Sequence, residues 1–261
     1  MFIYDMHVHV FPDKIAHKAA DSIGGFYGLH MDCNGTVEQL IEEENACGVN
    51  RMCIYSVAMN VHSMHSINTF IHSQLVAHPD LFTGMAAIHP DYDDFDGLIR
   101  DVQAMGFKGF KIHPDMQKFA LDDKRSMDMF AAIEGKMPIV IHTGDKRYNY
   151  SHPEQMKRVL DAFPNLTCIC AHLGGWSEWD DAYKSLAKYD NVYVDTSSSL
   201  YAMEPEHAAK IIRQYATERV MFGTDYPMWN AKEELERIAA VPLTDREREL
   251  IMGKNALALL G

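Results

Sequence analysis

Two histidines near the start of the chain, His7 and His9, have the spacing of metal ligands. They lie in the segment Asp5-Met6-His7-Val8-His9, which reads as a strand. Because successive side chains of a strand point to opposite faces, residues two apart project to the same side. Two imidazoles on one face can offer nitrogens to one divalent ion at roughly 2.0 to 2.1 Å. Taken alone, the pair is more often two partly exposed residues at the rim of a fold, so a metal site here requires further donors. Asp5 is expected on the same face, one layer deeper.

Three other polar residues, His142, His172 and Asp225, each follow a short apolar run that reads as a buried strand. The runs are 138–141, 168–171 and 220–223. A carboxylate directly after a buried strand is costly unless it is paired, hydrogen-bonded or bound to a metal. Asp225 could equally be a helix cap or a turn residue. In barrels of parallel strands, polar residues at the carboxyl ends of strands are typical of catalytic sites.

The elements that must position these residues alternate between short β-branched or aromatic runs and longer amphipathic stretches. That alternation is typical of a parallel sheet with helical crossovers. Eight strands are expected, at 2–9, 51–57, 82–88, 107–113, 137–142, 166–172, 191–195 and 219–223. Eight helices are expected, at 37–46, 63–77, 95–105, 124–134, 153–162, 178–189, 205–215 and 231–240. This pattern predicts an α/β fold, a (β/α)8 TIM barrel, with an open doubly wound sheet as the alternative.

Two segments stand outside this alternation. The residues after Ala240 add no further strand and predict an extra C-terminal helix, ending near Leu260, that closes over the barrel. The segment 10–35 reads as irregular, and so long a loop in a compact domain is usually a lid or a binding loop. No repeat, low-complexity tract or linker divides the chain, so one domain over residues 1–261 is expected.

Composition narrows the classes of function. The chain has 261 residues, 47% of them hydrophobic and 23% charged, which is typical of a globular enzyme. Its formal net charge of −13 disfavours nucleic-acid and anionic-lipid partners. No apolar run is long enough to span a membrane and no leader is evident, so a cytoplasmic protein without membrane contact is expected. The five cysteines lack the paired spacing of a zinc ribbon and are interpreted as reduced packing residues.

Taken together, His7, His9, His142, His172 and Asp225 resemble the ligand pattern of the amidohydrolase superfamily of metal-dependent barrel enzymes. The resemblance implies one divalent ion held by His7, His9, His142 and Asp225. Zinc is favoured for such donors, with manganese and iron as alternatives. An ion with an open position lowers the pKa of a bound water towards about 7. Asp225 would then accept the proton of that water and His172 would orient or polarise the scissile group, although these two roles could be exchanged.

The segments 222–227 and 253–260 further resemble the amidohydrolase-related branch of that superfamily. This branch holds hydrolases and also decarboxylases of the aminocarboxymuconate-semialdehyde type. We expect a hydrolase that acts on a small carbonyl or lactone-like substrate. The first alternative is a lyase that decarboxylates an unsaturated or aromatic acid without oxidation, and the second is a metal-binding barrel without catalysis.

The expected fourth strand adds a lysine and a histidine to the candidate site. Lys111 and His113 share one face by the period of two. Two-metal members of the superfamily often carry a carboxylated lysine on this strand. We expect instead a single ion, with Lys111 and His113 contacting the substrate or the metal ligands. A lysine paired with a buried acid such as Asp5 or Asp195 is a further alternative.

The loops expected at the mouth of the barrel are rich in aromatic residues and contain a few cations. Arg147, or its neighbour Lys146, could hold a substrate carboxylate, and Trp176 could pack against the substrate. A small molecule is therefore the expected partner. The resemblance and the surface helices also allow a homodimer.

Overall fold

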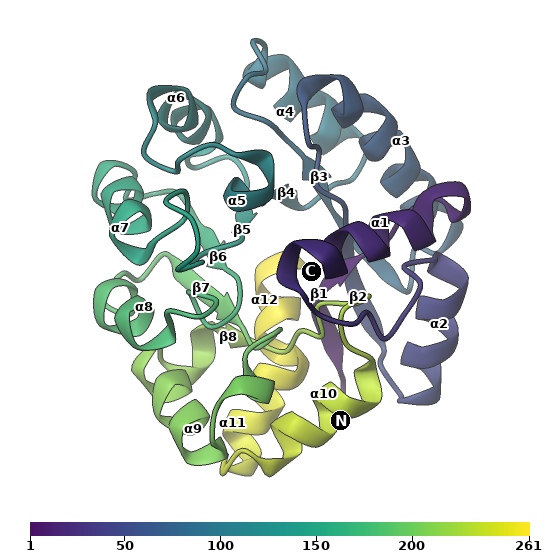
Figure 1. The fold of residues 1–261 in the computed structure, drawn as a ribbon, viewed down its shortest axis with the longest axis vertical. Helices are drawn as coiled ribbons and strands as arrows, with labels where there is room; N and C mark the ends of the chain where they lie inside the picture. Colours follow the sequence, from purple (N-terminus) through teal and green to yellow (C-terminus); the bar gives the residue numbers. More distant parts are fainter.

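Eight parallel strands, each hydrogen-bonded to the next in chain order, form the centre of the molecule (Figure 1). The computed structural model describes all residues from 1 to 261. The strands are β1 (Tyr4–His9), β2 (Arg51–Tyr55), β3 (Phe82–Ala87), β4 (Gly109–Ile112), β5 (Ile139–Ile141), β6 (Cys168–Cys170), β7 (Val192–Asp195) and β8 (Val220–Met221). All eight predicted strands are present, each somewhat shorter than expected at one or both ends.

The sheet closes between β1 and the chain around β8. Met6 donates its backbone N–H to the Phe222 carbonyl at 2.9 Å, and His9 donates to the Tyr226 carbonyl at 2.8 Å. Together with the strand order, these bonds confirm the predicted TIM barrel. The alternative of an open doubly wound sheet is wrong, because such a sheet would leave two edge strands without these partners.

The eight predicted crossover helices are also present and lie around the barrel (Figure 1). They are α2 (Val37–Ala46), α3 (Val61–Ala77), α4 (Phe95–Ala104), α6 (Lys124–Ile133), α7 (Pro153–Ala162), α8 (Trp179–Leu186), α9 (Pro205–Gln214) and α10 (Ala231–Ala240). Side-chain caps define several of their starts, as where Thr36 accepts the N–H of Gln39 ahead of α2. None of the helices is both long enough and apolar enough to cross a membrane.

The segment 10–35 is not irregular, and the prediction of a loop there was wrong. It contains the 15-residue helix α1 (Asp13–Tyr27), which passes over the carboxyl ends of the strands in Figure 1. The buried face of α1 consists of Ala16, Ala20 and Gly24. No side chain caps the start of this helix, and it contains the adjacent glycines Gly24 and Gly25, so the usual signals of a helix are missing from the sequence.

The predicted C-terminal extension is helical and closes the opposite end of the barrel. It comprises α11 (Asp245–Glu249), a π-helical turn (Leu250–Lys254) and α12 (Asn255–Leu260). Ala256 and Leu260 of α12 pack with residues of the barrel interior such as Tyr4 and Met221. The interior is therefore filled by side chains and by α12 below the level of the candidate site.

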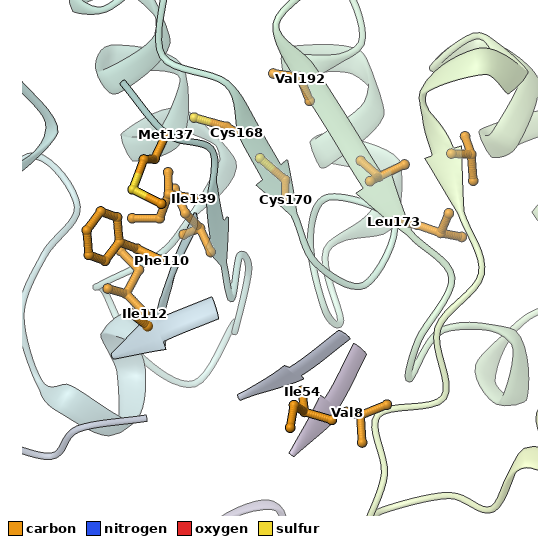
Figure 2. Packing of buried hydrophobic residues seen from close by; sticks show 14 of the residues in the cluster. Val8, Ile54, Phe110, Ile112, Met137, Ile139, Cys168, Cys170, Leu173 and Val192 are labelled. Carbon is orange, nitrogen blue, oxygen red and sulfur yellow. The ribbon is translucent and has the colours of Figure 1, made fainter. Parts of the chain in front are cut away.

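A second and larger hydrophobic layer lies between the strands and the surrounding helices. Figure 2 shows part of this layer, in which Ile54, Phe110 and Ile139 are among the packed side chains. Cys168 and Cys170 belong to it, and all five cysteines of the chain are free. This agrees with their interpretation as packing residues.

Strand β1 contains a bulge that decides where its side chains point. Between Asp5 and Val8 the pairing with β2 advances by one residue more on β1 than on its neighbour. A bulge changes the phase of the alternation of side chains. Met6 consequently packs in the barrel interior, whereas His7 and His9 both face the cavity at the carboxyl end.

The expectation that Asp5 shares a face with the two histidines was therefore wrong. One Asp5 oxygen accepts the backbone N–H groups of His7 at 2.9 Å and Thr224 at 3.0 Å. The other accepts the Thr224 hydroxyl at 2.5 Å. Asp5 is fully buried and, after burial itself, its charge raises the pKa of Glu44 on α2. Asp5 therefore stabilises the bulge that turns the His7 side chain towards the cavity.

Candidate active site

A cavity of about 350 Å³ lies at the carboxyl ends of the strands, beneath α1. Seven of its polar residues come from strand ends and are His7, His9, Lys111, His113, His142, His172 and Asp225, whereas Lys18, Ser22 and Tyr27 come from α1. Apolar side chains make up most of the remaining wall, including Ile15 and Ile23 of α1. Every residue that the sequence suggested as a metal ligand or catalytic group thus reaches one cavity.

Three of these residues form a triangle of potential metal donors. The Nε2 atoms of His7 and His9 are 3.3 Å apart, and Asp225 Oδ1 lies 3.3 Å from the first and 3.7 Å from the second. Donors at about 2.0 to 2.1 Å from a tetrahedral ion are about 3.3 to 3.4 Å apart. Burial, followed by the charge of Lys111, lowers the pKa of both histidines well below the usual value, so their lone pairs are available. The triangle fits one divalent ion.

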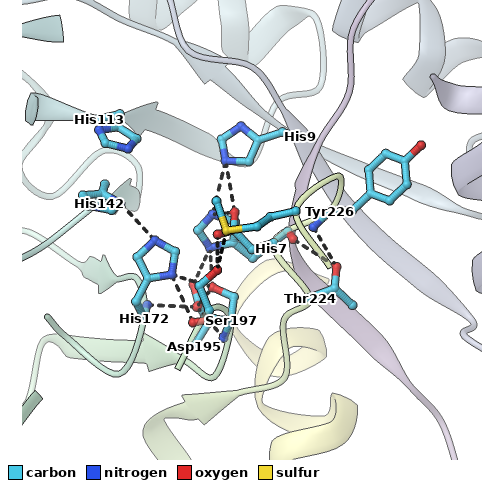
Figure 3. Close-up of polar contacts among 12 residues, drawn as sticks. His7, His9, His113, His142, His172, Asp195, Ser197, Thr224 and Tyr226 are labelled. Atoms are coloured by element: carbon cyan, nitrogen blue, oxygen red, sulfur yellow. Dashed lines mark hydrogen bonds and ion pairs between the residues drawn. The ribbon is translucent and has the colours of Figure 1, made fainter. Parts of the chain in front are cut away.

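The orientation of His7 is set by a carboxylate behind it. His7 Nδ1 lies 2.9 Å from Asp195 Oδ2 at the end of β7 (Figure 3). Because a carboxylate only accepts hydrogen bonds, Nδ1 carries the proton and Nε2 faces the triangle with a lone pair. A second-layer acceptor of this kind fixes the tautomer and ring orientation of metal-binding histidines.

The chain adopts an unusual backbone conformation where two of these side chains are presented. His172 and Asp225 are in the left-handed region, with φ of 60° and 68°. Non-glycine residues in that region cluster at functional sites, where the surrounding structure holds them. The Asp225 N–H donates to the His7 carbonyl at 2.8 Å, which holds Asp225 next to β1. Nearby, a Cβ at Gly223 would lie 2.9 Å from that of His7, so glycine permits this close approach.

The second oxygen of the Asp225 carboxylate is held by a serine. Asp225 Oδ2 accepts the hydroxyl of Ser198 at 2.5 Å, and Ser198 in turn accepts the Trp229 indole N–H at 3.0 Å. Burial raises the pKa of Asp225, while the Ser198 hydrogen bond and the charge of Lys111 oppose that increase. Oδ1 is thereby left free to face the triangle.

His142, the fourth expected ligand, lies outside the triangle beside His172. His172 Nδ1 donates to the Ser197 carbonyl at 3.1 Å, so its Nε2 carries a lone pair. That lone pair faces His142 Nδ1 at 2.9 Å, which must then carry a proton. His142 Nε2 is left buried with no hydrogen-bond partner. An unpaired buried nitrogen costs about 1–3 kcal/mol, which ligation of an ion could offset.

A second group of donors, His113, Asp115 and His142, does not form a comparable site, although its atoms lie within 4.8 Å of one another. His113 Nδ1 accepts the backbone N–H of Met116 at 3.2 Å, in the short helix α5 (Pro114–Gln117). Its Nε2 lies 2.7 Å from the Tyr27 hydroxyl. Both nitrogens are thus used. Moreover, the rings of His113 and His142 are stacked at 3.8 Å with 9° between their planes, so their lone pairs do not converge.

Lys111 lies on the cavity floor next to the triangle. It is fully buried, and its Nζ is 3.3 Å from His7 Nε2. Its ammonium also lies over the Tyr55 ring, 4.9 Å from the centroid. Burial lowers the pKa of Lys111 to about 8, against the opposing charges of Asp195 and Asp225. The amine is therefore close enough to the triangle to contact a ligand bound there.

Arg147 and Trp176 do not line the cavity, contrary to their expected contact with substrate. The Arg147 guanidinium donates to both Asp145 oxygens, at 2.9 and 2.7 Å, and to the Phe26 carbonyl at 2.7 Å. It lies 4.8 to 5.2 Å from the centroids of four aromatic rings, including Trp176. The Arg147 N–H groups are thus bonded within the protein. Arg147 connects the end of α1 to the loop after β5.

Three residues of the site region were only partly predicted from the sequence. Asp195 was considered as a possible partner of Lys111, Tyr27 was placed among the aromatic residues at the mouth of the barrel, and Lys18 was not considered. Asp195 could have been found, because it follows a buried strand as Asp225 does. Lys18 and Tyr27 line the cavity from α1. Their contact with the cavity follows from the packing of α1 across the strand ends, which an irregular segment 10–35 did not predict.

A TIM barrel whose imidazole and carboxylate groups converge at the carboxyl ends of its strands has the architecture of metal-dependent barrel enzymes. The family model described as amidohydrolase matches residues 4–261. The chain therefore belongs to the amidohydrolase family, and the resemblance seen in its ligand pattern is confirmed. No curated protein matches the sequence.

Solved structures share the fold over almost the whole chain. An uncharacterised TIM-barrel protein from Bordetella bronchiseptica is 20% identical with a TM-score of 0.81, covering 100% of this chain and 98% of that one. A dihydroxybenzoic acid decarboxylase from a Polaromonas species, with bound manganese and the inhibitor 2-nitroresorcinol, is 15% identical with a TM-score of 0.72 and coverages of 99% and 96%. A 5-carboxyvanillate decarboxylase from Sphingomonas paucimobilis is 16% identical with a TM-score of 0.72 and coverages of 99% and 98%. At these identities the likeness establishes the fold alone.

Proposed function

We propose that this protein is a metal-dependent decarboxylase that releases carbon dioxide from an aromatic or unsaturated carboxylic acid. This reverses the order of the two reactions expected from the sequence, where hydrolysis came first. The proposal rests chiefly on one observation, the separation of polar and apolar surface within the cavity.

The floor of the cavity is polar and its walls are largely apolar. Lys111 and the donor triangle lie on the floor, whereas side chains such as Phe11, Val57 and Met228 line the walls. This division suits a single-ring acid whose carboxylate points down and whose ring packs against the walls.

The similar structures support this choice of substrate class. Besides the two decarboxylases described above, a 2,6-dihydroxybenzoate decarboxylase complexed with 2,6-dihydroxybenzoate has a TM-score of 0.75 and covers 100% of this chain. These proteins act on ring carboxylic acids by their names, and their folds match this chain from end to end.

We assign His7, His9 and Asp225 as ligands of one divalent ion and His142, with its unpaired Nε2, as the fourth. Such an ion would supply positive charge that binds the substrate carboxylate and stabilises negative charge developing on the substrate. Zinc, manganese and iron all suit these donors.

The side chains must also manage one proton. The bond between the ring and the carboxyl carbon breaks, its electron pair stays on the ring carbon, and a proton takes the place of the carboxyl group. We assign delivery of this proton to Asp225 and orientation of the substrate to His172, since both line the cavity. The Lys111 ammonium contributes positive charge to the floor where the carboxylate would lie.

The proposal is tested by measuring both products with protein reloaded with zinc or manganese. A panel of hydroxylated and methoxylated benzoates, with lactones and amides beside it, would be assayed for release of carbon dioxide and for uptake of water. We expect carbon dioxide from at least one ring acid, about one ion per chain, and loss of both in His7→Ala. The matched control is His62→Ala, a histidine of α3 outside the cavity.

Hydrolysis is the second candidate, because Asp225 could equally accept the proton of a nucleophilic water. Turnover of a lactone or amide without carbon dioxide release would establish it in place of decarboxylation. A content of two ions per chain would indicate that Lys111 is carboxylated and binds metal, as in two-metal members of the superfamily, and would also favour hydrolysis.

A further inference from the structure

We propose that the hydroxyl of Tyr27 on α1 is a specificity-determining hydrogen-bond donor that selects ring acids carrying an additional oxygen acceptor, such as a methoxy, hydroxyl or carbonyl oxygen. The substrate class named here rests on the proposed function. The presence of the donor rests only on the hydrogen bonds around Tyr27.

The protonation state of the neighbouring histidine can be deduced from its contacts. His113 Nδ1 accepts the Met116 N–H at 3.2 Å, so that nitrogen carries no proton. With Nδ1 unprotonated, the ring is in its neutral form. A neutral imidazole has one N–H, which must therefore be on Nε2.

That N–H points at the Tyr27 oxygen, 2.7 Å away. Tyr27 accepts this hydrogen bond, and its own proton remains to be donated elsewhere. The phenol keeps that proton at neutral pH, as a tyrosine hydroxyl ordinarily does. Tyr27 lines the cavity, so an acceptor on a bound ligand can take the hydrogen bond.

The donor is held firmly in place. Phe26, the residue before it, is tied by its carbonyl to Arg147 at 2.7 Å. The Tyr27 ring also packs edge-on against Trp176 with 5.0 Å between centroids. A donor fixed before binding loses little entropy when it meets a ligand, so it can discriminate between similar ligands.

The Tyr27 hydroxyl makes no hydrogen bond other than the one with His113. Its α1 neighbours on the cavity wall include the polar Lys18 and Ser22 as well as Ile15 and Ile23, but neither polar side chain is bonded to it, so a ligand can supply the acceptor. A ring acid without a further oxygen would leave the Tyr27 proton without a strong partner. A ring acid with an oxygen on the side that faces α1 would accept the hydrogen bond from Tyr27. For a single neutral hydrogen bond we expect a gain of about tenfold in affinity.

The test is equilibrium binding of benzoate and its three monomethoxy derivatives to the metal-loaded protein, measured by calorimetry. A methoxy oxygen can only accept, so it reports on a protein donor. In the wild type, one isomer should bind about tenfold tighter than benzoate. In Tyr27→Phe, that advantage should disappear while benzoate itself binds as before. The matched control is Tyr148→Phe, a tyrosine near the mouth that does not line the cavity.

The outcomes separate the two proposals. If benzoates bind but Tyr27→Phe leaves every methoxy-to-benzoate ratio unchanged, the role of Tyr27 is overturned and the proposed function stands. If no benzoate binds the metal-loaded wild type, the proposed substrate class is wrong. The proposed selection by Tyr27 of ring acids with an oxygen acceptor is then wrong as well. Thermal unfolding of Tyr27→Phe checks that any loss does not come from misfolding.

Discussion

His7 Nδ1 lies 2.9 Å from Asp195 Oδ2, and both side chains are fully buried. A carboxylate at the end of β7 therefore decides which nitrogen of a β1 histidine faces the cavity. The same carboxylate accepts the backbone N–H groups of His172 and Ser197 through Oδ1, each at 3.1 Å. One buried acid thus couples three parts of the candidate metal site.

We expect Asp195→Asn to weaken metal binding. The amide oxygen should stay with the two backbone N–H groups, which turns the NH₂ group towards His7 Nδ1. His7 would then have to accept there and carry its proton on Nε2, the nitrogen needed for the ion. We expect metal affinity to fall by about 10- to 100-fold. Competition with a chromophoric chelator measures this, and Glu234→Gln, a buried acid outside the cavity, is the control. Unchanged affinity in Asp195→Asn would contradict the proposed role.

His172→Asn separates binding of the ion from turnover. His172 contacts His142 and Ser197 but is not part of the donor triangle. The variant should keep about one ion per chain while turnover falls by roughly 10²- to 10⁴-fold, the range for loss of an acid–base or orienting group. Elemental analysis and the carbon dioxide assay measure the two quantities. Wild-type turnover in the variant would remove His172 from the mechanism.

Arg147→Ala tests whether this arginine holds α1 or a substrate. The change removes the bonds to Asp145 and Phe26, so amide hydrogen exchange in α1 should become about tenfold faster or more. The control is Arg158→Ala, which removes an exposed arginine paired with Asp122 elsewhere. Weaker binding of benzoates with unchanged exchange in α1 would instead support the original expectation that Arg147 holds a carboxylate.

Glu234→Gln tests a buried acid on α10. Burial raises the pKa of Glu234 to about 7, although Arg237 opposes this, and one of its oxygens has no partner. The folded protein therefore holds this proton at pH values where the unfolded chain has lost it. The stabilisation is fully present below the usual glutamate pKa and is lost as pH rises through about 7.

The free energy of unfolding should accordingly fall between pH 5 and 8, with at most about 3 kcal/mol from this group. The slope should be shallower in Glu234→Gln. Denaturant titrations in the presence of a chelator measure it without contributions from metal binding. Glu38→Gln, at an exposed glutamate, should keep the wild-type slope. Equal slopes in all three proteins would show that Glu234 is ionised in the folded state.

The barrel could be predicted from the sequence because hydrophobic periodicity is a local property. Buried strands such as Ile139–Ile141 and amphipathic helices such as Val37–Ala46 carry their pattern within a few residues. Helix α1 was not predicted, because no side chain caps its start and Gly24 and Gly25 lie within it. Its contribution to the cavity depends on packing over the strand ends, which no local pattern encodes.

The candidate ligands could be found for a related reason. In a parallel barrel all carboxyl ends of strands meet at one face, so His7, His142 and Asp225 could be assigned to one site before any distance was known. Asp195 carries the same signal at the end of β7. The residue types and their order along the chain were therefore enough to predict metal chemistry.

Only the tertiary structure decided how these groups are arranged. The bulge in β1 turns Asp5 away from the cavity, and Asp195 selects the His7 tautomer. Arg147 is directed to Asp145 and α1, not to the cavity. The phase of the β1 bulge, the tautomer of His7 and the ion-pair partner of Arg147 all depend on contacts that hydrophobic periodicity does not encode. Small differences in atomic position decide which contact forms. The sequence determined which chemistry is available to this protein, and long-range packing decided which atoms can perform it.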